Sequence, residues 1–121
     1  MSDIETRKTD HIDLALKSEH QPQADSSFDR IRFEHNALPE LALSEINLDS
    51  EFLNYKLAAP LMIGAMTGGC DSGEIINRHL AEAAEACNIP MAVGSQRAAL
   101  ENNQTQTIRQ YAPNAVLFGN I

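Results

Sequence analysis

An apolar run that stops at a pair of glycines constrains this chain more than any other feature. Residues 58–66 are almost continuously apolar, and Thr67-Gly68-Gly69 ends the run before a helical pattern begins. Such a run is typical of a strand buried on both faces, and Leu61–Ala65 is predicted to be that strand. In α/β folds, cofactors and phosphorylated ligands bind at the carboxyl ends of the strands. Glycines there let a ligand approach the main chain, and a plain turn explains the glycines alone equally well.

Strand and helix patterns alternate along the rest of the chain. Asp71 is predicted to cap a helix, with Glu74 in a capping-box-like pair, and Asn88 is predicted to end it. The apolar stripe of this helix consists of Ile76, Leu80, Ala83, Ala84 and Cys87. The further elements predicted are a strand at Met91–Val93, a helix around Thr105–Tyr111 and a strand at Ala115–Phe118. Strands that alternate with helices indicate βαβ units, so the sequence predicts an α/β protein with a parallel sheet.

The N-terminal half lacks this alternation. Residues 1–59 are therefore predicted to form a separate helix, linker and arm, ahead of the βα units of residues 60–121. A helix is predicted over Ile4–Glu19 from apolar residues at i, i+3 and i+4 spacing. His20–Ser27 has no periodicity and is predicted as a loop, while Leu41–Leu48 fits either a strand or an irregular arm.

Charge and apolar content argue against several classes of partner. Seventeen acidic and nine basic side chains give a net charge of −8, which disfavours nucleic acids and anionic membrane surfaces. The longest apolar stretch, Leu57–Met66, falls short of the ~20 residues that span a bilayer. The polar N-terminus does not fit a secretory signal, and Cys70 and Cys87 lack metal or disulfide spacing. A cytoplasmic protein with reduced thiols is predicted.

Three side chains of the N-terminal helix form a candidate anion site. On a helix, Arg7 and His11 lie one turn apart and Lys8 lies about 100° from Arg7, so all three can project toward one patch. A dense anion such as a diphosphate suits that patch, because Arg offers a planar fork and Lys a point charge. A solvated helix face that pairs with neighbouring acidic residues is the commoner outcome for such side chains.

Small or polar groups also follow each predicted strand, at Thr67–Gly69, Ser95–Arg97 and Asn120. The hydroxyl, amide and guanidinium of Ser95–Arg97 suit a flavin edge or a phosphate, and a polar turn with Ser95 as a helix N-cap is the equal alternative. Asn120 offers both a donor and an acceptor. The sequence contains no acidic pair, Ser-His-Asp order or P-loop, so no catalytic residue or metal ligand is assigned.

Taken together, these residues resemble the N-terminal part of a type 2 isopentenyl-diphosphate isomerase, a flavin-dependent family that interconverts isopentenyl and dimethylallyl diphosphates. The resemblance runs from Arg7 to Asn120. Its motifs are R-K-T-D-H at Arg7–His11, N-A-L-P-E at Asn36–Glu40, P-L-M-I-G-A-M-T-G-G at Pro60–Gly69, I-N-R-H-L-A at Ile76–Ala81, G-S-Q-R at Gly94–Arg97 and A-P-N at Ala112–Asn114. Each motif is weak alone, whereas six in this order and spacing are highly specific.

The resemblance implies a fold and a set of contacts. The family folds as a TIM (β/α)8 barrel with FMN at its C-terminal mouth, of which this chain would supply about three βα units plus an N-terminal helix and arm. The residues implied in substrate binding are Arg7, Lys8, His11, Ser95, Gln96 and Arg97. Those implied in FMN binding are Ala65, Met66, Thr67, Gly68, Ser95 and Asn120, with Gly69 giving the flavin room.

The resemblance also implies cofactors and partners. In this family, reduced FMN is thought to act as an acid and base in a redox-neutral 1,3-proton shift, NADPH reduces the flavin, and Mg²⁺ neutralises the diphosphate. The substrate is a small-molecule diphosphate, and full-length members are often homo-oligomers. The family's substrate-binding Gln and Mg²⁺-binding Glu have no counterpart in these residues.

Length sets a further expectation. A complete barrel usually needs about 250 residues, so this chain is expected to be an N-terminal fragment that is inactive alone. Two alternatives stay open. One is an FMN barrel that oxidises lactate or glycolate, which would leave Arg7 and Lys8 without a role. The other is a non-catalytic remnant.

Overall fold

The chain folds as an α/β unit with a long N-terminal arm. A computed structural model describes residues 3–17, 19, 26–101 and 108–120. Within these residues there are two small sheets, the antiparallel hairpin β1–β2 and the parallel pair β3–β4. The predicted α/β class with parallel strands is therefore confirmed, and the described residues form no closed barrel.

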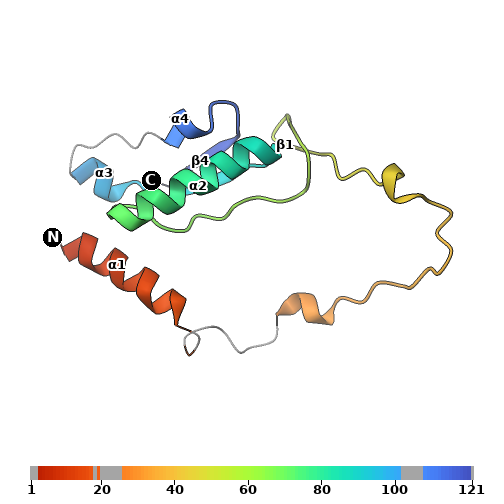
Figure 1. Cartoon of the computed structure of the whole chain (residues 1–121), viewed down its shortest axis with the longest axis horizontal. Helices are drawn as coiled ribbons and strands as arrows, with labels where there is room; N and C mark the ends of the chain where they lie inside the picture. The colour runs from red at the N-terminus through yellow and green to blue at the C-terminus, as the bar shows by residue number, and fades with distance from the viewer. Residues whose placement is uncertain (1–2, 18, 20–25, 102–107, 121) are drawn as a thin grey trace.

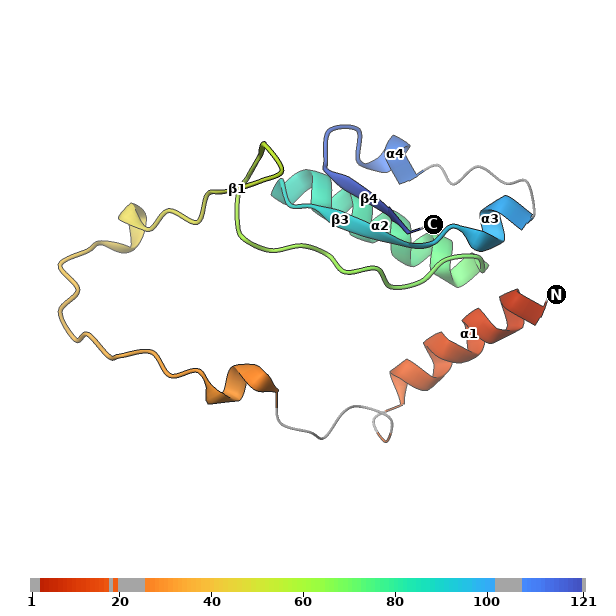
Figure 2. The same cartoon turned by 180° about the vertical axis from the view of Figure 1, so that it is seen from behind.

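The parallel pair β3 (Met91–Ser95) and β4 (Leu117–Asn120) is the centre of the fold. Helix α2 (Asp71–Cys87) packs against β3, and the short helix α4 (Ile108–Tyr111) packs against α2. In Figure 2 the strands lie in front of α2, and no described helix covers their other face. The core residues between these elements are Ala81, Ala84, Met91, Val93, Ala112 and Ala115. Burying Met91 alone contributes about 2 kcal/mol.

The strand predicted at Leu61–Ala65 is wrong as a regular element. Ile63 forms one isolated parallel bridge to Met91, with Ile63 N–H donating to Pro90 O at 2.9 Å and Ala92 N–H donating to Ile63 O at 2.8 Å. Leu61 and Met62 are 65% and 54% exposed, so this segment is not buried on both faces. Apart from this bridge, the segment pairs with no strand among the described residues.

Helix α2 is confirmed, but its start and its buried face differ from the prediction. The N-cap residue is Cys70, without a side-chain cap bond, so Asp71 is not the cap. The residues of the helix that are buried are Gly73, Asn77, Ala81 and Ala84. Ala83 and Cys87, which the predicted stripe included, are exposed. Asn88 ends the helix as predicted, in the left-handed conformation at φ 48° that Asn tolerates better than most residues.

The N-terminal region is an exposed arm. Helix α1 (Asp3–Leu16) begins it as predicted and stops short of Glu19. The loop predicted at His20–Ser27 falls mostly outside the described residues. Residues 26–49 are all exposed, with 3-10 turns only at Ser27–Arg30 and Leu43–Glu45. Figure 1 shows this stretch as a wide arc away from the sheet, so the irregular arm was the correct alternative.

The hairpin β1 (Ser50–Phe52) and β2 (Tyr55–Leu57) was not predicted. Its two-residue turn places Leu53 and Asn54 at φ 50° and 66°. This is the backbone a tight hairpin requires, although Leu rarely supplies it. The hairpin lies at the amino ends of the parallel strands, where Ala58 N–H donates to Asn88 O at 3.1 Å and the Phe52 and Phe118 rings lie 6.0 Å apart.

The C-terminal elements are shifted from their predicted positions. The five-residue helix α3 (Arg97–Glu101) follows Ser95, in agreement with the alternative in which Ser95 caps a helix. Helix α4 begins only at Ile108, and the first part of the helix predicted around Thr105 falls outside the described residues. Strand β4 begins two residues later than predicted and runs through Asn120, so this residue belongs to the strand.

Candidate functional site

The carboxyl ends of the strands converge, as the sequence predicts. Ser95 of β3 is the register partner of Asn120 of β4, and Gln96 N–H donates to Asn120 O at 2.9 Å. The Thr67–Gly68 peptide packs against Gly94, one residue before Ser95. Thr67, Gly68, Ser95, Gln96 and Asn120 are called the strand-end site below.

Thr67 faces inward within this site. The residue is 9% exposed, and its carbonyl oxygen accepts a 2.8 Å hydrogen bond from Asn77 Nδ2 on α2. Its hydroxyl lies against the first turn of α2, since a Cβ added at Gly73 would stand 3.1 Å from Thr67 Oγ1. The hydroxyl expected to project from the strand end is therefore packed against the protein.

Gly68 and Gly69 present bare backbone at the same place. Gly68 is buried, and its amide has no hydrogen-bond acceptor among the described residues. Such an orphaned buried amide is uncommon in a folded chain. Gly69 has φ 77°, a left-handed backbone that glycine adopts without the cost a side chain would bring. The two glycines thus supply an unused donor and a turn that redirects the chain into α2.

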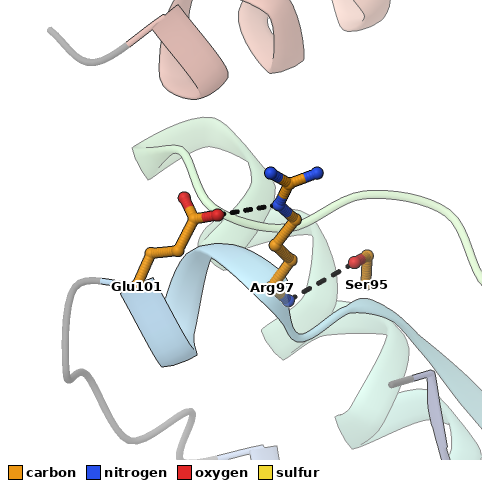
Figure 3. A network of polar contacts seen from close by, with 3 residues as sticks. All are labelled: Ser95, Arg97 and Glu101. Carbon is orange, nitrogen blue, oxygen red and sulfur yellow. Dashed lines mark hydrogen bonds and ion pairs between the residues drawn. The ribbon is translucent and has the colours of Figure 1, made fainter.

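Ser95, Gln96 and Arg97 form the polar turn that the sequence allowed as an alternative. Arg97 N–H donates to Ser95 Oγ at 3.3 Å, and Gln96 Nε2 donates to Gly94 O at 2.8 Å. Figure 3 shows the Ser95 hydroxyl at the start of α3, where it satisfies one amide of that helix. Both side chains therefore support the turn itself, and Ser95 and Gln96 stay half-buried.

Arg97 is an exposed cation beside this turn. Its Nε lies 2.7 Å from Glu101 Oε1 one helical turn away, and the hydrogen bond and charge of Glu101 raise the pKa of the guanidinium. Figure 3 shows the two terminal nitrogens pointing away from Glu101, toward the side on which α1 passes. The guanidinium is permanently charged and retains its fork for an anion.

The remaining predicted residues form no hydrogen bond or ion pair to the strand-end site within the described part of the chain. In Figures 1 and 2, the start of α1 lies on the same side of the molecule as the end of β4, and α1 contacts α2. Arg7 and His11 are exposed and Lys8 is half-buried. Among the described residues, no hydrogen bond or ion pair joins these three to the strand-end site. Ala65 and Met66 are exposed on the segment that leads to Thr67.

The described part of the chain contains neither a metal-binding cluster nor a helix able to cross a membrane. Residues 3–17, 19, 26–101 and 108–120 hold no group of three or more His, Cys, Asp or Glu side chains placed to bind a metal ion. No helix in these ranges combines the length and apolar character needed to cross a membrane.

Sequence reasoning missed the residues that hold the strand-end site together. Asn77 and Gly94 both touch the Thr67–Gly68 peptide, and both lie in the sequence motifs without having been assigned a role there. A signal existed in α2, where Gly73, Asn77, Ala81 and Ala84 repeat at spacings typical of one helix face. Small residues on one face indicate close packing against another segment, and a single amide among them indicates a polar group to be satisfied there.

Comparisons with known proteins agree with the motifs. The profile of the family described as FMN-dependent dehydrogenase matches residues 2–117. Curated relatives called isopentenyl-diphosphate delta-isomerase include those of Pseudescherichia vulneris, 48% identical over 95% of this chain and 35% of the relative, and of Pyrococcus furiosus, 45% identical over 95% of this chain and 31% of the relative. These similarities confirm the resemblance. The chain spans about a third of the length of the relatives it matches.

Proposed function

Because the chain belongs to the FMN-dependent dehydrogenase family, we propose that it supplies the first βα units of a flavin-dependent isopentenyl-diphosphate delta-isomerase. The observation that carries this proposal is the identity of 43–48% to relatives of that name over at least 95% of the chain. The complete protein would be a (β/α)8 barrel in which β3 and β4 are neighbouring strands, residues 60–121 contribute the barrel part and residues 1–59 the substrate-binding arm.

The strand-end site has features that suit FMN. The buried Gly68 amide has no acceptor among the described residues, glycines 68 and 69 leave the backbone bare, and Ala65 and Met66 offer exposed apolar surface for a flat ring. When bound, reduced FMN would provide the acid and base for the allylic proton shift. Gly68 would donate to the flavin, while Ser95 and Asn120, paired across β3 and β4, would hold its edge.

The substrate diphosphate would bind on the cationic side of this site. Arg7 and Lys8 of α1 would close over the diphosphate together with Arg97, whose terminal nitrogens point to the side of α1. His11 and Gln96 would add hydrogen bonds. Holding the diphosphate with fixed cations orients the small hydrocarbon part of the substrate, which carries no polar group of its own.

The remaining cofactors and partners follow from the same family. NADPH would reduce the flavin. The described residues offer no metal-binding cluster, so Mg²⁺ would be held by the diphosphate and other parts of the complete enzyme, and no step is assigned to it here. A cytoplasmic homo-oligomer is the proposed assembly.

The proposal is tested with a chimaera. The matching stretch of about 120 residues in the Pseudescherichia vulneris relative is replaced by this chain, and conversion of isopentenyl diphosphate is followed with FMN, NADPH and Mg²⁺ present. We expect the chimaera to form dimethylallyl diphosphate and the 121-residue chain alone to form none. A soluble chimaera that binds FMN but does not isomerise the substrate would refute the proposed function.

The proposed diphosphate contact is tested in the same chimaera. Lys8→Ala should raise KM for isopentenyl diphosphate at least about tenfold, because a charge-assisted contact to the diphosphate is lost. Lys17→Ala is the matched control, since Lys17 is an exposed lysine just beyond α1, and its KM should match that of the unchanged chimaera. Equal KM values for the two variants would remove Lys8 from the site.

A further inference from the structure

One buried amide on α2 has no role in the proposed chemistry. Asn77 is 2% exposed and lies among the small buried residues of the helix. Burying an amide side chain costs free energy unless it is hydrogen-bonded. Its Nδ2 makes one 2.8 Å bond, to the carbonyl oxygen of Thr67, ten residues earlier in the chain. The bond therefore joins the helix to the segment that ends at the strand-end site.

We propose that Asn77 is a positioning residue that fixes the orientation of the Thr67–Gly68 peptide. The bond holds the Thr67 carbonyl toward α2. No cis peptide occurs among the described residues, and in a trans peptide the N–H points opposite to the C=O. The Gly68 N–H is consequently directed away from the Asn77 amide. Rotation of this peptide would present a carbonyl acceptor where the structure presents a donor.

A second element restrains the same peptide. A Cβ added at Gly94 would collide with the Thr67 carbonyl group, whose carbon would lie 2.7 Å from it. Gly94 is buried in β3, so the peptide lies flat against the bare backbone of the strand. Asn77 supplies a polar restraint on the peptide and Gly94 a steric one.

The inference deepens the proposed function, on which it rests for the identity of the ligand. An electron-rich oxygen or nitrogen of the flavin requires a donor, and Gly68 N–H is held ready before the ligand arrives. A donor fixed in advance costs no reorganisation on binding. Loss of the Asn77 bond should weaken FMN binding even though Asn77 itself does not touch the flavin.

The sharpest test exchanges the donor for a titratable group. In Asn77→Asp, the new buried carboxyl donates to Thr67 O when protonated and repels that oxygen when ionised, and burial raises the pKa of such a group. FMN binding is measured on the full 121-residue chain by flavin fluorescence at pH 5 and pH 8.5. We expect an affinity near that of the unchanged chain at pH 5 and at least about tenfold weaker binding at pH 8.5.

The matched control is Asn47→Asp. Asn47 is exposed, and its side-chain oxygen accepts from Asp49 N–H at 2.8 Å, a bond that a carboxylate also accepts. The ratio of FMN affinities at the two pH values should be the same in Asn47→Asp as in the unchanged chain, which removes the titration of the FMN phosphate from the comparison. An equal ratio in Asn77→Asp would overturn the inference.

A second measurement tests the role of Asn77 independently of the proposed flavin site. The carbonyl ¹³C shift of Thr67 should follow pH in Asn77→Asp and stay constant in the unchanged chain, whether or not FMN is present. A shift that ignores pH in both would overturn the inference. Absence of FMN binding by the unchanged chain would instead count against a flavin site in this chain, with the carbonyl shift still deciding the role of Asn77.

A variant without a titratable group distinguishes weaker FMN binding from unfolding of Asn77→Asp at high pH. Asn77→Leu has similar size and no donor, and it should weaken FMN binding about tenfold at both pH values with an unchanged circular dichroism spectrum. Full affinity in a folded Asn77→Leu chain would refute the positioning role.

Discussion

At the scale of single residues, Gly94 has the closest backbone contact with the strand-end site of the glycines in the described residues. In Gly94→Ala, the new Cβ would collide with the Thr67 carbonyl, and both partners are backbone. Since neither can move aside cheaply, we expect the substitution to lower the free energy of unfolding by about 2 kcal/mol. Urea unfolding of the chain, followed by circular dichroism, measures the change.

Gly64→Ala is the control for that experiment. A Cβ at Gly64 meets nothing within 4 Å, so the unfolding midpoint should stay within error of the unchanged chain. A midpoint for Gly94→Ala equal to that of Gly64→Ala would show that the segment at Thr67 does not pack on β3 as described.

The residues of the strand-end site could be predicted only in part. Ser95 and Asn120 were identified because parallel strands end at one edge, and that rule needs only the order of elements. Asn77 and Gly94 were not, because each acts through a backbone group far away in sequence. The inward side chain of Thr67 was missed for the same reason, since burial of a strand-end hydroxyl depends on which helix residue faces it.

At the scale of elements, Glu85 joins α2 to the start of β4. Its carboxylate accepts from Asn114 N at 2.9 Å, Asn114 Nδ2 at 2.7 Å and Ala115 N at 2.8 Å. The hydrogen bonds from Asn114 are the main reason that the pKa of Glu85 lies below its usual value of 4.5. The A-P-N motif thus has a structural role, as the segment that docks on this carboxylate.

This junction predicts a pH dependence of stability. Because the folded-state pKa of Glu85 is lowered, its contribution is present above the usual pKa and is lost as pH falls through the folded-state value. In Glu85→Gln, we expect lower stability at pH 7 and a smaller loss of stability on acidification from pH 5. Thermal unfolding at a series of pH values measures both effects.

Glu82→Gln is the matched control on the same helix. Glu82 forms an exposed ion pair with Arg78 at 2.9 Å, a kind of contact worth about 0–1 kcal/mol. The stability of the Glu82→Gln chain should fall on acidification as steeply as that of the unchanged chain. A Glu85→Gln chain that loses stability on acidification as steeply as Glu82→Gln would contradict the role given to the Asn114 bonds.

Helix α2 was predictable because seventeen residues of helical pattern outweigh local ambiguity. Its buried face could not be predicted, because Ala83 and Ala84 are the same residue type and only the segments packed against the helix determine that Ala84 is the buried one. The segment at residues 61–65 carries a strong strand pattern yet gains a single bridge. A strand in a parallel sheet forms its hydrogen bonds with neighbouring strands. The sequence of the segment therefore indicates its preference for extended structure but does not determine which strands it pairs with.

At the scale of the whole molecule, the arm exposes an unusual amount of apolar surface. Phe28, Phe33, Leu38 and Leu43 are 79–93% exposed. Exposed apolar surface of this extent favours association, and the outer edge of β4 has no neighbouring strand among the described residues. We expect the 121-residue chain to associate with rising concentration, with an increase in weight-average mass in sedimentation velocity across the micromolar range.

Polar substitution of the arm tests the cause. Phe33→Ser with Leu43→Ser should reduce association, because both side chains are exposed and their loss removes apolar surface without disturbing the core. His35→Ser, an exposed change on the same arm, is the control. If the double serine variant associates as strongly as His35→Ser, the open edge of β4 and not the arm would be the cause of association.

The hairpin gives the two ends of the parallel strands different tasks. Asn88 carries the connection at one end, donating from Nδ2 to Lys56 O at 3.3 Å and accepting from Ala58 N–H, while the proposed ligand contacts all lie at the other. Damage at the hairpin end should thus appear as a melting defect with normal affinity, whereas loss of the ligand contacts at the opposite end should lower affinity.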